Sequence, residues 1–294
     1  LRHSGAPYVL LLPTFVLLSV FTFVPFVWAF TTSLYEYEIG GEARFVGFEN
    51  YFEYFGDVTF FISIRNMLLL TAFAVVVNIV VPLTIAKLIF SLSSERARYL
   101  YRVLFLIPVV VPSVAQYLIW KSMIYGESGL LNEFLRAAGL ESMARAWLSD
   151  PSTALLAVAF VGFPFANGIN ILIFYAGLSA IPESVHEAAR LDGATGLRKF
   201  LTMDVPLVLS QIRLLVILTI IAGVQSFEGV FLLTRGAPGF ETMVPGLWMY
   251  YNAFNWQRMG FACAIGVILF LTIAGLTALN ARYLRSSEQL QGQR

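Results

Sequence analysis

The chain has 294 residues, of which 58% are hydrophobic and 13% are charged, and its mean hydropathy is +0.76. Soluble globular proteins carry about 25% charged residues, so this composition excludes a water-covered surface and indicates an integral membrane protein. The net charge of +1 provides no basic surface for nucleic acid, and we expect no nucleic-acid partner. The single cysteine, Cys263, excludes an intrachain disulfide.

Six apolar runs are each long enough to cross about 30 Å of hydrocarbon as a helix. They cover residues 8–32, 66–90, 103–124, 153–178, 206–233 and 260–283. A barrel would need alternating strands of about ten residues, and stretches such as residues 73–77 (FAVVV) do not alternate. We therefore predict an all-α fold with six transmembrane helices in one domain, residues 1–294.

The first run exceeds the roughly 7–15 residues of a signal-peptide core, so we expect it to be retained as a span. Because the sequence opens on Leu1 rather than Met, we also expect a few N-terminal residues to precede it.

Arginine and lysine are concentrated in alternate loops. The loops after the second and fourth runs and the C-terminal tail hold Arg96, Arg98, Arg102, Arg190, Arg198, Lys199, Arg282, Arg285 and Arg294. The opposite loops are mainly acidic and hold Glu36, Glu38, Glu42, Glu49, Glu53, Asp57, Glu127, Glu133, Glu141 and Asp150. The positive-inside rule then places both termini on the cytoplasmic side of the cell membrane. Lys87 and Arg213 lie near inner ends of runs, where snorkelling accounts for them.

Prolines within the runs predict kinks, because each removes a backbone hydrogen bond that neighbouring helices can replace. These residues are Pro13, Pro25, Pro82, Pro108, Pro112 and Pro164. Kinked helices suit a protein that opens and closes, and a static bend is the alternative at each position.

The polar segment 182–205, the 182–205 loop, separates the fourth and fifth runs. Pro182 can start a helix on which Val185, Ala188 and Ala189 share one face. Gly193 can then take a left-handed cap and reverse the chain. On helical pattern alone, an ordinary amphipathic loop at the membrane interface is an equal alternative.

A second short helix follows in the same loop. Leu197, Phe200 and Leu201 make its apolar stripe. Asp204 can cap the fifth run, with Pro206 in the first turn of that run. The two helices predict a helix-turn-helix on the cytoplasmic face.

The order E-A-A-x-x-D-G-A, followed by Phe and then Pro at intervals of six residues, resembles the coupling loop of permease subunits in ATP-binding-cassette importers. The matching residues are Glu187, Ala188, Ala189, Asp192, Gly193, Ala194, Phe200 and Pro206. The resemblance implies that this loop docks an ATPase subunit, with Glu187 offering a charge and Gly193 the turn.

Four further segments are similar to the larger, carbohydrate-uptake permeases of the maltose and glycerol-phosphate first-permease type. They lie in residues 11–66, 102–151, 176–182 and 227–262. Two stretches depart from the pattern, residues 163–167 (FPFAN) and 235–239 (RGAPG), and these leave the identity of the solute open.

By resemblance, the fold is that of a type I importer permease, which pairs with a second homologous permease. Two ATPase subunits and an external solute-binding protein complete such an assembly, and membrane lipid surrounds it. The chain lacks a G-x-x-x-x-G-K-[ST] phosphate loop. We therefore expect no enzymatic activity, catalytic residue, metal site or bound cofactor here, with ATP and Mg on the partner ATPase subunits.

Amide side chains inside the runs are candidates for a solute pathway, because they offer hydrogen bonds to hydroxyl groups without net charge. Asn167 and Asn170 lie three residues apart in the fourth run and are the first choice. The further candidates are Asn78, Gln116, Gln225 and Glu228. A helix-helix hydrogen bond is the alternative for the amides, and an interfacial carboxylate for Glu228.

The sequence thus predicts the permease subunit of an ATP-driven importer for a sugar, with an amino-acid or polyamine importer as the nearest alternative. A secondary carrier would normally need repeats and ionisable residues inside the membrane. A membrane-embedded hydrolase is disfavoured because His3 and His186 fall outside the runs, so neither can serve an intramembrane Ser-His dyad. We expect His186 to be a solvated loop residue.

Overall fold

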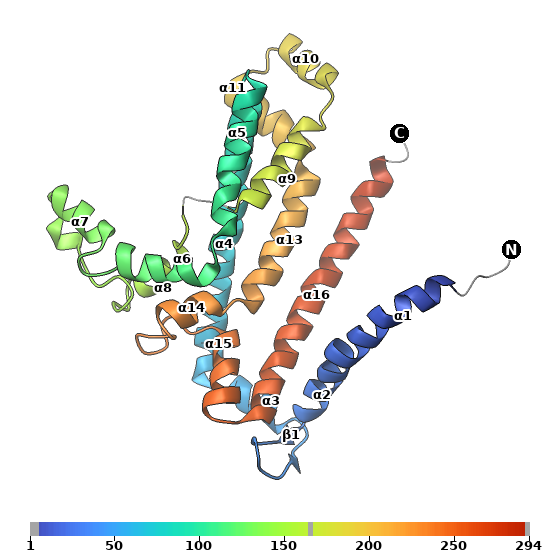
Figure 1. Cartoon of the computed structure of the whole chain (residues 1–294), viewed down its shortest axis with the longest axis vertical. Coiled ribbons are helices and arrows are strands. Elements are labelled where there is room, and N and C mark those ends of the chain that lie inside the picture. Colours follow the sequence, from blue (N-terminus) through green and yellow to red (C-terminus); the bar gives the residue numbers. More distant parts are fainter. Residues whose placement is uncertain (1–5, 164–166, 292–294) are drawn as a thin grey trace. The chain divides into compact units, whose positions relative to one another are not determined.

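The computed structural model describes residues 6–163 and 167–291 (Figure 1). Its fold is all-α, as predicted, with one small two-stranded ribbon among the described residues. The α-helices are α1 (Ala6–Leu18), α2 (Val24–Thr32), α3 (Glu49–Gly56), α4 (Val58–Ser91), α5 (Glu95–Leu106), α6 (Ser113–Ile119), α7 (Leu130–Ala137), α8 (Ala154–Ala159), α9 (Gly168–Ser179), α10 (Glu183–Leu191), α11 (Gly196–Lys199), α12 (Val205–Leu207), α13 (Leu209–Gln225), α14 (Glu228–Leu233), α15 (Pro245–Tyr250) and α16 (Met259–Gln291). Shorter π or 3-10 segments are η1 (Ser19–Phe23), η2 (Ile107–Val110), η3 (Trp120–Ile124), η4 (Glu141–Met143), η5 (Phe200–Asp204) and η6 (Tyr251–Asn255).

The chain divides into two compact units. The first unit holds the residues up to Phe61 together with Pro245–Arg282, and the second holds Ile62–Val244 and the chain after Arg282. α4 therefore begins in the first unit and continues through the second. The 182–205 loop and all of the candidate pathway residues belong to the second unit.

In the first unit, the segment after α2 is tied to the start of α16. Strands β1 (Tyr35–Glu36) and β2 (Arg44–Phe45) pair antiparallel, with Tyr35 opposite Phe45 and Glu36 opposite Arg44. Arg258 donates two hydrogen bonds of 2.6 Å to the carboxylate of Glu53. Both bonds come from Nη2, so one guanidinium nitrogen bridges the two carboxylate oxygens in a charge-assisted contact. It holds α3 against the residue that precedes α16.

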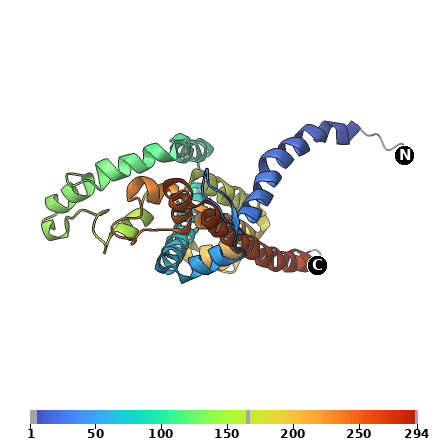
Figure 2. The same cartoon turned by 90° about the horizontal axis from the view of Figure 1, so that it is seen from below.

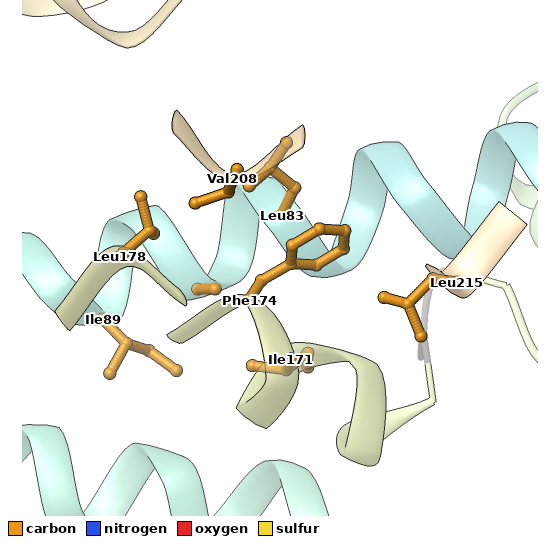
Figure 3. Packing of buried hydrophobic residues seen from close by; sticks show 8 residues of the cluster. Leu83, Ile89, Ile171, Phe174, Leu178, Val208 and Leu215 are labelled. Carbon is orange, nitrogen blue, oxygen red and sulfur yellow. The ribbon is translucent and has the colours of Figure 1, made fainter. Parts of the chain in front are cut away.

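The core of the second unit lies where α4, α9 and α13 pack together. Figure 3 shows Phe174 of α9 between Leu83 of α4 and Leu215 of α13. The buried cluster comprises Leu83, Ala86, Ile89, Ile171, Phe174, Leu178, Val208 and Leu215. In a membrane, lipid is as apolar as these side chains, so close van der Waals packing stabilises the contact.

Glycines allow helices of the second unit to approach closely. A Cβ atom on Gly223 of α13 would lie 2.4 Å from Oγ1 of Thr71 on α4. A Cβ atom on Gly168 at the start of α9 would lie 2.2 Å from the carbonyl oxygen of Phe105 on α5. Small residues at these crossings are typical of packed transmembrane helices. Figures 1 and 2 agree that α7, beyond α6, lies away from α9 and α13.

Three helices are long and apolar enough to cross a membrane unbroken, at Tyr8–Thr32, Val58–Ser91 and Met259–Leu279. The second begins eight residues before the expected start at residue 66, because the apolar run continues back through residues 60–64 (FFISI). Three bent helix pairs also pass the same test, giving up to six spans among the described residues.

Three expected spans are not continuous helices. The bend in 103–124 agrees with the kink predicted at Pro112, whereas the breaks in 206–233 correct the prediction of one helix there. The span at 103–124 bends by 87° between Val110 and Ser113, where Pro112 takes an extended ψ of 137° and supplies no amide hydrogen. The span at 153–178 is interrupted between α8 and α9, where Gly162 has a φ of +86°. Pro164, for which we predicted a kink, lies outside the described residues.

The span at 206–233 is interrupted twice. A bend of 71° separates α12 from α13, so the long helix begins at Leu209 rather than at Pro206. It ends at Gln225, where Ser226 takes an extended ψ of 124°, and α14 follows as a separate helix. The second break lies in the polar stretch 225–228 (QSFE), whereas the first lies among mostly apolar residues.

Candidate functional site

The first arm of the 182–205 loop is helix α10, which ends in a left-handed glycine cap. Gly193 has a φ of +71°. The amide of Ala194 donates to the carbonyl of Ala189 at 2.9 Å, and the amide of Gly193 donates to that of Arg190 at 3.1 Å. This pair of hydrogen bonds is the Schellman motif. The helix, its glycine cap and the chain reversal all agree with the sequence-based prediction, with Pro182 just before the first helical residue.

α10 has one face directed to solvent and one directed to the rest of the second unit. Glu187 and Ala188 are exposed, and Leu191 is 90% exposed. Ala189 and His186, three residues apart, are buried. The prediction that His186 is a solvated loop residue is therefore wrong. The helical register carries its side chain inward, and its ring lies 5.9 Å from the ring of Phe90 on α4.

The pKa of His186 is lowered from its ordinary value of 6.5. Burial is the largest cause, because a low-dielectric surrounding disfavours the charged imidazolium. The positive charge of Lys199 on α11 acts in the same direction, whereas Asp204 and Glu183 oppose it. The imidazole is thus held in its neutral form near neutral pH.

The second arm of the loop ends in a buried ion pair. Asp204, at the end of η5, is completely buried, and its Oδ2 atom lies 2.5 Å from Nζ of Lys87 on α4. Two predictions are corrected here. The side chain of Asp204 does not cap the helix that follows it, and Lys87 pairs with a carboxylate instead of only reaching to the membrane interface. A buried carboxylate needs a partner charge, and Lys87 supplies it.

The remaining residues of the sequence motif lie along the same loop. Phe200 is partly buried and packs against the α4, α9 and α13 core, whereas Leu197 and Leu201 are exposed at 70% and 55%. Asp192 is the C-cap residue of α10, and Pro206 lies in α12. The loop therefore presents exposed leucines to solvent from both of its arms.

The candidate pathway residues in α9 are separated by the start of that helix. Asn167 is the N-cap, and its Oδ1 accepts a hydrogen bond of 3.0 Å from the amide of Ile169. Its side chain is exposed and bonded to the start of α9, whereas that of Asn170 is buried, so the two amides do not form the expected pair. Asn170 is buried, and its Nδ2 donates to the carbonyl of Asn78 on α4 at 3.4 Å. The structure thus brings Asn78 and Asn170 together.

The other three candidates lie near the breaks in the helices. Ser113, the first residue of α6, donates a hydrogen bond of 3.0 Å to Oε1 of Glu228, the first residue of α14. Gln116 is one turn further along α6, and its Nε2 atom lies 2.8 Å from where a Cβ atom of Gly162 would be. Gln225 is the exposed last residue of α13. Glu228 begins a different helix, so these two are not neighbours on one helical turn.

Sequence reasoning missed the partnership of Lys87 with Asp204 and the burial of His186. One signal was present, because a lone lysine and a lone aspartate near the inner ends of apolar runs are costly unless they meet. A second signal was the spacing of His186 and Ala189, which places both on one helical face.

An array of apolar helices, with an amphipathic helix-turn-helix between α9 and α13, defines a multi-pass membrane protein. Residues 78–285 match the family described as the binding-protein-dependent transport system inner membrane component. This match covers more than half of the chain, and the chain belongs to that family.

Relatives and a solved structure agree with this assignment. The chain is 29% identical over 289 residues to the probable ABC transporter permease protein YurN of Bacillus subtilis, covering 98% of this chain and 99% of YurN. It is 29% identical to the sulfoquinovosyl glycerol transport system permease protein SmoG of Agrobacterium fabrum, covering 95% of this chain and 90% of SmoG. A bacterial alginate ABC transporter, solved with an alginate pentasaccharide-bound periplasmic protein, has a chain with a TM-score of 0.79 at 20% identity, covering 94% of this chain and 92% of that chain. The fold is the type I importer permease fold.

Proposed function

We propose that this chain is the permease subunit of an ATP-driven importer, and that its solute is a carbohydrate delivered by an external solute-binding protein. The family description names dependence on a binding protein, and the relative SmoG transports a sugar derivative. The four segments that resemble carbohydrate-uptake permeases support the same solute class.

The 182–205 loop is the proposed docking site for an ATPase subunit, and its geometry is the observation that carries the proposal. The exposed face of α10 offers Glu187 as a charge and Ala188 as a small residue that allows close approach. The exposed Leu191 and Leu197 add apolar anchors on the two arms. Ala189 serves a different purpose, because it packs inward beside His186. Gly193 supports the turn between the arms.

Energy is proposed to come from other chains. Two ATPase subunits would bind ATP and Mg, and a second homologous permease would complete the pathway through the cell membrane. The positive-inside distribution of charge supports a cytoplasmic position for the 182–205 loop and for both termini. Nothing in the proposed role requires a cofactor or metal bound by this chain.

The solute pathway is proposed to pass the polar residues at the helix breaks. Asn167, Gln116, Gln225 and Glu228 are exposed in the second unit, so their polar groups are accessible to a hydroxylated solute. Asn78 and Asn170 support the contact between α4 and α9.

The experiment that tests the function uses the assembled complex. A tag on this chain should recover an ATPase and a second permease from membranes of the native host. Addition of the binding protein loaded with its carbohydrate should raise the ATPase rate several-fold, whereas the empty binding protein should have less effect. If an amino acid or polyamine raised the ATPase rate instead, the result would contradict the proposed solute class. If the tagged chain were recovered without any ATPase, the result would contradict the proposed function.

A further inference from the structure

Two buried polar groups of the 182–205 loop lack hydrogen-bond partners among the residues that the structure describes. Both ring nitrogens of His186 are unpartnered, and so is Oδ1 of Asp204. These side chains are 3% and 0% exposed. A buried polar group without a partner costs about 1–3 kcal/mol. The imidazole can donate and the carboxylate can accept, so a single hydrogen bond between them would satisfy Oδ1 of Asp204 and one of the two ring nitrogens of His186.

One turn of α4 already contacts both residues. Lys87 forms the ion pair with Asp204, and Phe90, three residues later, packs against the ring of His186. Residues three apart are neighbours on a helix. The negative charge of Asp204 acts to raise the pKa of His186, against the larger effect of burial. α4 therefore meets the first and second arms of the loop at one place.

We propose that His186 and Asp204 are positioning residues that form a hydrogen bond with each other when the ATPase subunits bind ATP, and that they are apart in the conformation described here. In the bonded state, the imidazole N–H donates to Oδ1 of Asp204 while Lys87 keeps Oδ2. This bond joins α10 to η5, so both arms of the loop move together with α4. The inference rests on the proposed docking role of the loop.

The unpartnered groups make the separated conformation less stable. The conformation in which His186 and Asp204 form a hydrogen bond is therefore favoured once the ATPase subunits move α10. Leaving a donor and an acceptor unsatisfied raises the free energy of the separated state, and the hydrogen bond removes that penalty. A ligand shifts such an equilibrium only by its differential affinity for the two states. Because the hydrogen bond itself favours the bonded state, the ATPase subunits need a smaller difference in affinity between the two states to shift the equilibrium.

Protonation is linked to this change. The charged groups around the imidazole are Glu183 on α10, Lys199 on α11, Asp204 on η5 and Lys87 on α4, and Arg98 of α5 lies over the Phe90 ring at 5.9 Å. In the separated state burial keeps the imidazole neutral. A carboxylate acceptor favours the imidazolium, so the pKa of His186 rises when the bond forms. By linkage, the bonded state takes up protons and is favoured at acidic pH.

The chain contains only two histidines, which allows a direct test. A His3→Gln variant leaves His186 as the single imidazole. This variant, as the one chain labelled with ¹⁵N-histidine, is assembled with unlabelled ATPase subunits and the unlabelled second permease in lipid nanodiscs, and NMR then reports the pKa of His186. We expect that pKa to rise by about 1 or more when ATP and vanadate trap the complex. An unchanged imidazole in the trapped complex overturns the proposal.

Two variants separate this hydrogen bond from a general packing role. Asp204→Asn should abolish the rise in the pKa of His186, whereas Glu183→Gln, which removes a neighbouring charge on the exposed side of α10, should preserve it. A rise that survives in Asp204→Asn contradicts the assignment of the acceptor.

A functional measurement covers the case in which Asp204→Asn fails to fold. The ratio of solute imported to ATP hydrolysed should rise on acidification from about pH 8 to pH 6 in the parent complex and stay flat in His186→Gln. The same pH dependence in both overturns the proposal. If the His3→Gln chain binds no ATPase subunit, the result contradicts the docking role of the 182–205 loop. This outcome is distinct from an unchanged imidazole in the trapped complex, which contradicts the hydrogen bond between His186 and Asp204.

Discussion

The amide of Ala194 donates a hydrogen bond of 2.9 Å to the carbonyl of Ala189, five residues earlier in the chain. This bond closes α10 only because Gly193, between the two residues, takes a φ of +71°. Residues with a Cβ atom reach that conformation at a cost of about 1–2 kcal/mol. A second glycine, Gly139 after α7, closes its helix in the same way, with a φ of +73°.

This pair of glycines gives the first prediction a matched control. A Cβ atom at either glycine meets no other atom within 4 Å, so alanine adds only backbone strain. Gly193→Ala should weaken recovery of the ATPase subunit with the tagged chain, and Gly193→Pro should weaken it further. Gly139→Ala should leave that recovery unchanged, because α7 lies in a loop that we place on the opposite side of the membrane. Equal losses from both alanine variants would show that the effect is general instability.

The second prediction concerns the ion pair between Lys87 and Asp204. Lys87→Met should destabilise the chain by about 3–5 kcal/mol, because it leaves a completely buried carboxylate without a partner charge. Asp204→Asn should destabilise it less, since the side chain of Lys87 is 25% exposed and reaches solvent. The double variant Lys87→Met with Asp204→Leu should recover much of the loss.

Thermal unfolding of the purified chain in detergent measures these differences. Arg44→Met is the control, because it breaks an ion pair with Glu36 in which both side chains are more than half exposed, and exposed pairs contribute little. A midpoint for Lys87→Met equal to that of the parent chain would contradict the importance of the buried pair.

The third prediction separates helix capping from solute contact at Asn167. Loss of an N-cap costs about 1 kcal/mol, so Asn167→Leu should lower the yield of folded complex as well as transport. Asn167→Ser keeps a capping oxygen and should restore the yield but not the full uptake rate. Uptake kinetics equal to those of the parent complex in Asn167→Ser and in the Asn167→Leu, Asn170→Leu double variant would remove both asparagines from the pathway.

The fourth prediction concerns the side of the membrane on which each loop lies. In a Cys263→Ser background, single cysteines at Glu42 and Glu141 should react with a membrane-impermeant maleimide added to spheroplasts. A cysteine at Arg96 should react only after the membrane is opened. All three parent positions are exposed, so accessibility within the chain does not decide the result. Labelling at Arg96 in intact spheroplasts would reverse the orientation.

Local signals in the sequence were sufficient to predict the helix and the turn of the first arm of the 182–205 loop. Pro182 and Gly193 each act within a few residues, and the structure places the start and the cap of α10 where these residues predict them. The predicted face was wrong in part, because Ala188 is exposed whereas Ala189 is buried beside His186. The family could likewise be predicted, because its motif is continuous in sequence.

Long-range contacts were not predictable in the same way. Lys87 and Asp204 are 117 residues apart, so their pairing depends on how α4 packs against the end of η5. The burial of His186 depends on Phe90 in another helix. The bend before α6 falls at Pro112, where a kink was predicted, but its size of 87° was not predicted.

The proposed role of this chain is carbohydrate import with energy from ATP. The direct measurement is uptake of radiolabelled solute into proteoliposomes that hold the purified complex, with its loaded binding protein on the outside and ATP enclosed. We predict uptake that requires both ATP and the binding protein and is lost in Glu187→Lys, which reverses the charge on the exposed face of α10. Uptake driven by an ion gradient without ATP, or uptake undiminished in Glu187→Lys, would contradict the account.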